Sequence, residues 1–205
     1  KQYLKVAGKT VIEQTLERLL RLPGLENIVV ALGEGDPFWP GLGISNDTRL
    51  VTVKGGKERA DSVLNGLYKL RQLGSDDDWV LVHDAARPCV RLTEIELLIE
   101  TCVNHRQGGI LATPVHDTMK RSDNHNRILE TIPRENLWHA CTPQLFRIGE
   151  LTELKVQLGQ VVEQQKGLRQ IIESLENQIE TSLRTLTTAE EEVNSCGAQI
   201  AEAQR

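Results

Sequence analysis

The chain has 205 residues, of which 26% are charged, and a formal net charge of −5. Because this balance is mildly acidic and contains no basic block, it excludes a typical nucleic-acid-binding surface. No apolar run approaches membrane-spanning length and no signal peptide opens the sequence, so we expect no membrane partner.

The four cysteines lie far apart and form no Cys-x-x-Cys pair. This spacing argues against a zinc site and against a disulfide framework. It predicts reduced thiols and therefore a cytoplasmic protein.

The first elements alternate between helix and strand. Thr10 and Glu13 have the spacing of a capping box that opens a helix, which the pair Pro23-Gly24 ends. Apolar runs at 28–32 and 49–53 predict two strands, separated by a loop rich in glycine and proline. Small residues at 55–62 then lead into a helix that we expect to run to about residue 73, with backbone N–H groups open to a ligand at its start.

The stretch 79–89 is the organising element of the first 150 residues. The apolar run 79–82 predicts a strand that is buried on both faces, as in a parallel sheet between helices. Asp84 and Arg87 follow it directly. Ligands of open α/β sheets bind outside the carboxyl ends of strands, where Asp84 can hold a hard cation and Arg87 a phosphate or carboxylate. The alternative is that Asp84 only caps the next turn and Arg87 is solvated.

The elements after residue 90 complete an α/β pattern. Thr93 and Glu96 predict a capped helix through residue 103, and 110–115 predicts a further strand. Residues 117–121 and 128–132 form the two arms of a predicted hairpin, after which 137–144 returns to the sheet. This order predicts a doubly wound, mostly parallel sheet with a β-hairpin arm over residues 1–150.

Residues 151–205 carry a heptad pattern that continues to the end of the sequence. With position a at Leu151, Ile172 and Ile179 fall at a, whereas Leu168 and Leu175 fall at d. Gln165 and Ser182 interrupt the seam, which otherwise continues through Val193, Cys196, Ile200 and Ala203. A repeat of 3.5 residues sustained over this length predicts a long coiled-coil helix, and isoleucine at a with leucine at d favours a parallel dimer.

Six sequence blocks between residues 1 and about 150 resemble one family in order and spacing. They are Lys1-Gln-Tyr-Leu, Gly55-Gly-x-Glu-Arg-Ala-Asp-Ser-Val, Val82-His-Asp-Ala-Ala-Arg-Pro-Cys, Gly108-Gly-Ile-Leu-Ala, Pro114-Val-x-Asp-Thr-Met-Lys-Arg and Leu137-Trp-x-Ala-x-Thr-Pro-Gln. Together they resemble the 2-C-methyl-D-erythritol 4-phosphate cytidylyltransferases of the non-mevalonate isoprenoid pathway. The resemblance implies transfer of CMP from CTP to methylerythritol phosphate with release of pyrophosphate.

The resemblance also implies a role for each matching residue. The expected catalytic groups are Lys1, which stabilises the transition state, and Arg134, which positions the substrate. Asp84 is the expected ligand of Mg²⁺, the cofactor. The expected nucleotide-binding residues are Gly56, Lys57, Ser62 and Ala85, with Lys57 contributing only its backbone amide. The expected substrate-binding residues are Arg87, Thr118, Arg134 and Thr142. The arm at 116–135 is expected to complete the site of a neighbouring subunit. We therefore expect a homodimer that forms through the arm, through the 151–205 coiled coil, or through both.

The chain departs from the family at both ends. The glycine-rich phosphate loop of the family precedes the position of Lys1, and the family's Lys-Val-Thr segment has no match after residue 150. Because Lys1 is not preceded by this loop and Met119 is the only methionine, we expect a fragment with reduced or absent activity. Two alternatives remain open: a coiled-coil scaffold protein with a non-catalytic globular domain, and a cytidylyltransferase for another polyol phosphate such as ribitol phosphate.

Overall fold

The computed structural model describes the backbone of residues 1–203 and the side chains of residues 1–190. It divides into two compact units, Lys1–Lys155 and Val156–Arg205, which are described separately. The predicted seam residues Val193, Cys196, Ile200 and Ala203 lie outside the residues whose side chains are described.

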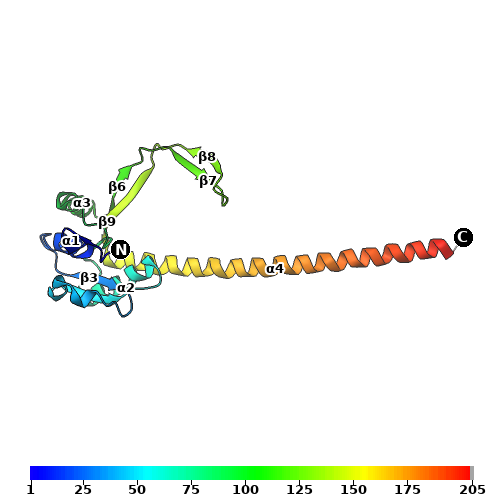
Figure 1. Ribbon diagram of the computed structural model, residues 1–205, viewed down its shortest axis with the longest axis horizontal. Helices are drawn as coiled ribbons and strands as arrows, with labels where there is room; N and C mark the ends of the chain where they lie inside the picture. The colour runs from blue at the N-terminus through cyan, green and yellow to red at the C-terminus, as the bar shows by residue number, and fades with distance from the viewer. Residues whose placement is uncertain (204–205) are drawn as a thin grey trace. The chain divides into compact units, whose positions relative to one another are not determined.

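The first unit opens with a small hairpin and a capped helix (Figure 1). Strands β1 (Lys5–Val6) and β2 (Lys9–Thr10) pair antiparallel, and α1 (Val11–Leu19) follows at once. Thr10 Oγ1 accepts a hydrogen bond from the Glu13 N–H at 3.3 Å, and the Glu13 carboxylate accepts one from the Thr10 N–H at 2.9 Å. The predicted capping box is therefore confirmed.

The central elements alternate as the sequence pattern predicts. They are β3 (Ile28–Leu32), the short 3-10 helices η1 (Trp39–Gly41) and η2 (Gly43–Asn46), β4 (Leu50–Lys54), α2 (Arg59–Leu73) and β5 (Trp79–Val82). Helix α2 packs against both β3 and β4. The strands predicted at 28–32 and 79–82 and the helix end near residue 73 are confirmed, and the second strand begins one residue later than predicted.

The remaining elements of this unit are α3 (Leu92–His105), β6 (Gly109–Pro114), the hairpin strands β7 (Met119–Ser122) and β8 (Ile128–Ile132), and β9 (Trp138–Arg147). The predicted hairpin is confirmed, with β7 and β8 antiparallel. The predicted capping pair of α3 is wrong. Arg91 is the N-cap and its N–H donates to Glu94, so Thr93 already lies inside the helix.

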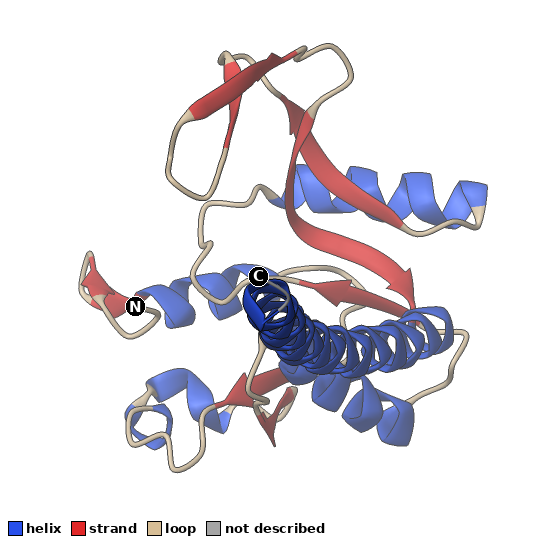
Figure 2. Ribbon diagram, turned by 90° about the vertical axis from the view of Figure 1, so that its right-hand side faces the viewer, coloured by secondary structure: helices blue, strands red, loops and turns tan. Residues whose placement is uncertain are grey.

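The strands form separate sheets, whereas the sequence predicts one mostly parallel sheet. Strands β3 and β4 form a parallel pair, and β5, β9 and β6 form a second sheet in that order. Strand β9 runs antiparallel to both of its neighbours, since the chain returns from the hairpin between them. Figure 2 shows these groups of strands in red. The α/β class is confirmed, and the parallel character is limited to the β3–β4 pair.

Apolar side chains bury the helices against these sheets. Ile12 and Leu16 of α1 pack with Val30 of β3, and Ile95 of α3 packs with Leu19 and Leu22 at the end of α1. Leu67 of α2 packs with Val80 of β5, together with Ile148 and Leu151. The strand and the helices that position residues 82–87 are thus fixed by buried contacts on several sides.

Helix α4 (Ile148–Ala203) starts three residues before the predicted 151 boundary. Its first turn belongs to the first unit, where Ile148, Leu151 and Thr152 are buried. From Val156 onward the helix constitutes the second unit. No helix within residues 1–203, α4 included, has an apolar stretch long enough to cross a membrane.

Candidate functional site

A carboxylate held by two arginines lies directly after β5. Asp84 Oδ1 accepts hydrogen bonds from Arg59 Nε at 3.1 Å and from Arg59 Nη2 at 2.9 Å. Asp84 Oδ2 lies 3.0 Å from Arg87 Nε. The Asp84 side chain is 30% exposed, so it faces guanidinium groups and solvent rather than hydrocarbon. The site therefore has a concentration of charge at the carboxyl end of a strand, where α/β sheets bind ligands.

Arg59 is the residue of this cluster that the sequence reasoning missed. It occupies the first position of α2 and reaches across to Asp84 from another segment of the chain. Arg59 could have been identified from its position inside the block at 55–62, because the resemblance assigns residues of this block to nucleotide binding.

The loop at the start of α2 is built on two tight contacts. The Gly56 N–H donates to Ser62 Oγ at 3.0 Å, and that hydroxyl donates to the Glu58 carbonyl at 3.2 Å. A Cβ atom on Gly56 would lie 2.0 Å from the Cβ of Asp61, so the loop requires glycine there. Lys57 is exposed at its tip. Gly56 and Ser62 are thus in contact.

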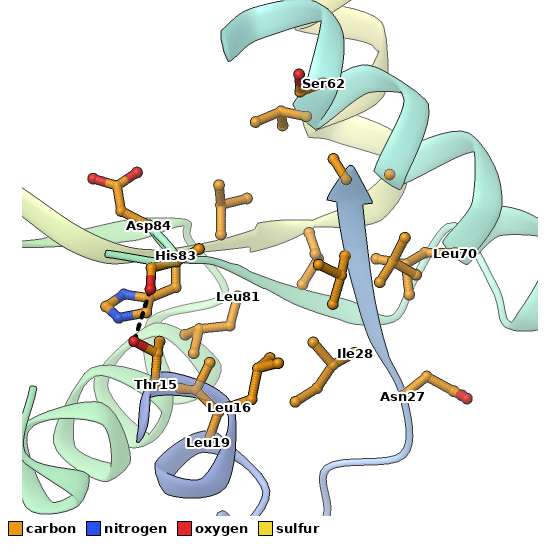
Figure 3. A pocket seen from close by; sticks show the side chains of 18 of the residues that line it. Thr15, Leu16, Leu19, Asn27, Ile28, Ser62, Leu70, Leu81, His83 and Asp84 are labelled. Carbon is orange, nitrogen blue, oxygen red and sulfur yellow. Dashed lines mark hydrogen bonds between the residues drawn. The ribbon is translucent and has the colours of Figure 1, made fainter. Parts of the chain in front are cut away.

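The loop after Asp84 is tied to the core by hydroxyl groups. The Ala85 carbonyl accepts a hydrogen bond at 2.8 Å from Thr15 Oγ1 on α1, drawn as a dashed line in Figure 3. The Asp84 N–H donates to Thr142 Oγ1 on β9 at 3.4 Å. Ala85 and Thr142 therefore lie beside Asp84.

His83 lies beneath the same loop. One ring nitrogen, Nε2, lies 3.0 Å from the Arg87 carbonyl oxygen. Burial lowers the pKa of His83 below its usual range, so the neutral ring is favoured. The contact with Arg87 indicates that His83 shapes the loop.

A cavity of about 680 Å³ opens beside the cluster of Asp84, Arg59 and Arg87, which we call the rim. Its polar end is lined by Arg59, Ser62, Asp84 and Ala85, and its apolar part by residues such as Leu16, Leu19, Ile28 and Leu81. Figure 3 shows Ser62 and Asp84 on one side of this space and Thr15, Leu16 and Leu19 below it. The volume is in the range of small-molecule pockets.

Three predicted site residues lie elsewhere in the first unit. Thr118 and Arg134 are exposed at the base of the β7–β8 hairpin, where Arg134 Nη1 donates to the His116 carbonyl. Lys1 is exposed, although its neighbours Gln2 and Tyr3 line the cavity. The structure therefore brings together Gly56, Ser62, Asp84, Ala85, Arg87 and Thr142, with Lys57 exposed on the loop next to Gly56, but not Lys1, Thr118 or Arg134.

The rim offers one carboxylate to a metal ion. Within the described residues, no group of three or more His, Cys, Asp or Glu side chains gathers into a metal-binding cluster. Mg²⁺ commonly keeps several waters and is held by one or two carboxylates together with substrate phosphates. The Asp84 carboxylate, whose two oxygens are paired with Arg59 and Arg87, fits that mode where a cation takes the place of one guanidinium, and it does not fit a cation held by the protein alone.

Comparison with known proteins identifies the family. A sequence model of the 2-C-methyl-D-erythritol 4-phosphate cytidylyltransferases matches residues 1–169. The enzyme of that name from Vibrio parahaemolyticus is 56% identical over 153 residues, which cover 74% of this chain and 64% of that protein. The one from Pseudomonas aeruginosa is 51% identical over 152 residues, covering 74% and 65%. The chain therefore spans about two thirds of the length of these relatives.

Solved structures agree with the sequence comparison. The cytidylyltransferase of Francisella tularensis superposes with a TM-score of 0.70 at 37% identity, covering 80% of this chain and 74% of that one. The Thermus thermophilus enzyme gives a TM-score of 0.60 at 28% identity, covering 78% and 71%. The match in sequence extends past residue 150, where our six blocks end. The chain belongs to the 2-C-methyl-D-erythritol 4-phosphate cytidylyltransferase family.

Proposed function

We propose that this chain binds CTP with Mg²⁺ at the Asp84 rim and transfers CMP to 2-C-methyl-D-erythritol 4-phosphate, releasing pyrophosphate. The observation that carries the proposal is the cluster of Asp84, Arg59 and Arg87 beside the Gly56–Ser62 loop in a chain of this family. Phosphoryl transfer of this kind gathers charge on phosphate oxygens, so it requires cations and hydrogen-bond donors rather than a covalent nucleophile.

The residues around the rim divide between the two substrates. Gly56, Lys57, Ser62 and Ala85 would hold the nucleotide, with the loop amides at the start of α2 as donors. Asp84 would hold Mg²⁺, which would neutralise the charge of the triphosphate. Arg87 and Thr142 would hold the methylerythritol phosphate, since a guanidinium group forks onto phosphate oxygens.

The hairpin would complete the site of a second subunit. Thr118 and Arg134 lie apart from Asp84 in their own chain. On the arm, the side chains of Ile128 and Leu129 are 66% and 63% exposed. Apolar side chains so exposed on a hairpin favour contact with a partner. We therefore propose that Thr118 and Arg134 reach the site of the partner chain, and that Lys1 acts on the phosphates as a cation.

The seam of α4 favours a second dimer contact. Its apolar a and d residues between Leu154 and Leu186 are all at least half exposed: Leu154, Leu158, Val161, Leu168, Ile172, Leu175, Ile179 and Leu186. A stripe with this spacing is typical of a parallel coiled coil. Sedimentation of Ile172→Lys, with the charge placed in the seam, should give monomers or a weaker dimer, whereas Gln170→Lys outside the seam should sediment like the parent chain. Equal sedimentation of the two variants would contradict the coiled coil.

Pyrophosphate release tests the reaction. The chain is mixed with CTP, Mg²⁺ and methylerythritol phosphate, and release should require all three. Asp84→Asn should lower the rate by about 100-fold or more, since it removes the metal-binding charge, whereas Asp77→Asn, the same change on an exposed turn, should leave the rate unchanged. Equal rates of pyrophosphate release by Asp84→Asn and by the parent chain would contradict the proposal. A faster rate with ribitol phosphate than with methylerythritol phosphate would show that the acceptor is a different polyol phosphate.

The family match disfavours a purely structural role. A coiled-coil scaffold would need no Asp84 cluster, and the match covers residues 1–169, where this cluster lies.

A further inference from the structure

Helix α4 carries charges on only one of the two flanks of its apolar seam. Figure 1 shows α4 as one unbroken helix, so the heptad register with a at Leu151 applies along it, and the flanking positions are e and g. Within the described side chains, the g positions after residue 151 are all uncharged: Gln157, Gln164, Ile171, Gln178 and Thr185. The charged e positions are basic in the first half of the helix, Lys155 and Arg169, and acidic in the second half, Glu176 and Glu190.

A parallel dimer would give these four charges no partner. Parallel helices bring the g side chains of one helix next to the e side chains of the other. Because the g positions are uncharged, no opposite charges would meet across that interface. The ion pairs within α4, Lys166–Glu163 and Arg184–Glu180, lie on the outer face and involve none of the four.

Reversing one helix changes which flanks meet. In an antiparallel pair, e lies beside e of the other helix, g lies beside g, and each a residue shares a layer with a d residue. We align the two copies so that the two-fold axis passes between residues 173 and 174. Arg169 then faces Glu176 of the second copy, and Lys155 faces Glu190 of the second copy. Two-fold symmetry makes each of these contacts twice, so all four charges of both helices are paired.

The same alignment pairs the two polar interruptions of the seam. Gln165, at position a, shares its layer with Ser182 of the second copy, at position d. A side-chain amide can donate to a hydroxyl group, so the two polar groups can satisfy each other inside the interface. The layers nearest to them are apolar and join side chains that are at least half exposed in the single chain: Ile172 with Leu175, Ile179 with Leu168, and Leu186 with Val161.

Neighbouring alignments lose these matches. Because the seam repeats every heptad, one helix can slide along the other only by whole heptads. Sliding by one heptad in one direction places Arg169 against Arg169 of the second copy, and sliding in the other direction places Glu176 against Glu176. Both shifts also move Gln165 away from Ser182. Facing like charges disfavour an alignment, so the sequence selects one register as well as one direction.

We propose that α4 binds the α4 of a second copy of this chain in the antiparallel direction, with Gln165 in the layer of Ser182. This arrangement rests on the α4 dimer contact proposed above and takes the place of its parallel direction. The isoleucine and leucine positions favour two helices, whereas the flanking charges determine how the helices run. The occupant is a second copy because the basic half of the flank is complementary to the acidic half of the same sequence.

Disulfide capture reads the direction of the helices. Gln165→Cys and Ser182→Cys are introduced together into the full chain, which is oxidised with copper phenanthroline and digested with trypsin. The antiparallel alignment predicts a disulfide that joins peptide 156–166 to peptide 170–184, whereas a parallel dimer would join each peptide to its own copy. The mixed link cannot form within one chain, since the two positions are about 25 Å apart along the helix. The native cysteines lie on other tryptic peptides.

A matched control pair lies on the same two peptides. Gln160→Cys with Thr181→Cys places both thiols at position c, on the outer face of the helix. This variant should give neither the mixed link nor the links between identical peptides.

Charge reversal gives a second readout, the dissociation constant of the dimer from sedimentation. Arg169→Glu and Glu176→Arg, each alone, bring like charges together twice and should weaken the dimer by about tenfold. Combining both changes in one chain restores opposite charges, and so does mixing the two single variants, so each should return the constant to within about threefold of the parent value. Arg184→Glu, the same change on the outer face, is the control and should alter it by less than about threefold.

Three results would overturn the proposal. Links between identical peptides would overturn the antiparallel direction while leaving a dimer. A dimer that gives no mixed link, or that is not restored by the combined charge reversal, would overturn the alignment. A chain that sediments as a monomer would overturn the contact itself, and with it the α4 dimer of the proposed function. None of these measurements involves CTP or turnover, so they are independent of the proposed transferase activity.

Discussion

The hydroxyl of Thr15 connects the core of α1 to the loop that follows Asp84, and removing it should loosen that loop. Thr15 is 2% exposed, and its Oγ1 lies 2.8 Å from the Ala85 carbonyl oxygen. Thr15→Val keeps the branched shape but deprives this carbonyl of its donor. Ala85 is exposed, so water can replace the donor, and the cost is that of one intramolecular hydrogen bond, about 0.5–1.5 kcal/mol out of the roughly 5–15 kcal/mol that stabilises a typical domain.

Thr15→Ser is the matched control. Serine keeps the hydroxyl and loses one methyl group, which costs about 0.8 kcal/mol of buried apolar surface. Urea denaturation gives the free energy of unfolding of both variants, and amide exchange at Arg87, whose N–H donates to the Asp84 carbonyl, reports on the loop. Thr15→Val should accelerate exchange at Arg87, whereas Thr15→Ser should not. Equal exchange in the two variants would refute the reasoning.

Three further predictions test the packing and charges around this site. In urea denaturation, Ile95→Ala should lower the free energy of unfolding by about 2–5 kcal/mol, because Ile95 is fully buried. Leu97→Ala is the control on the same helix. The Leu97 side chain is 63% exposed, so this change should alter the free energy of unfolding by less than about 0.5 kcal/mol. Thr10→Ala should cost about 1 kcal/mol through loss of the α1 cap. The Thr10 hydroxyl and then its backbone N–H hold the pKa of Glu13 below its usual range, so this stabilisation is present above the unfolded carboxyl pKa of about 4.3 and is lost as pH falls through the lower folded pKa. The variant should therefore lose stability less steeply than the parent chain in acid, and parallel pH curves would argue against the hydrogen bonds. Finally, burial raises the pKa of the Cys102 thiol, whereas Cys89 is exposed. Iodoacetamide should therefore modify Cys89 at least about tenfold faster than Cys102, as measured by peptide mapping. Comparable rates at the two cysteines would contradict the burial of Cys102.

Local signals in the sequence were sufficient for most elements. The Thr10–Glu13 pair predicts the start of α1 because both partners lie within four residues, and the run 79–82 predicts β5 because it is short and β-branched. The start of α3 was misplaced by two residues because two overlapping pairs, Arg91 with Glu94 and Thr93 with Glu96, compete for the cap. Threonine is the commoner cap residue, so local preference favoured the wrong pair.

The arrangement of the strands depends on contacts that the sequence pattern does not contain. Strand β9 pairs with β5 and β6, which precede it by many residues, and its antiparallel direction follows from the path of the hairpin. The contact of Arg59 with Asp84 is of the same kind, since 25 positions separate them. Motif reasoning found Asp84, Gly56 and Ser62 but had no means of placing Arg59 against that carboxylate.

Calorimetric titration of CTP with Mg²⁺ into the chain tests the central claim most directly, because it needs neither turnover nor the second substrate. The account predicts that CTP binds in a Mg²⁺-dependent manner, that Asp84→Asn loses most of this dependence, and that Asp77→Asn retains it. If CTP binds equally well to Asp84→Asn with and without Mg²⁺, the rim beside β5 is not the nucleotide site.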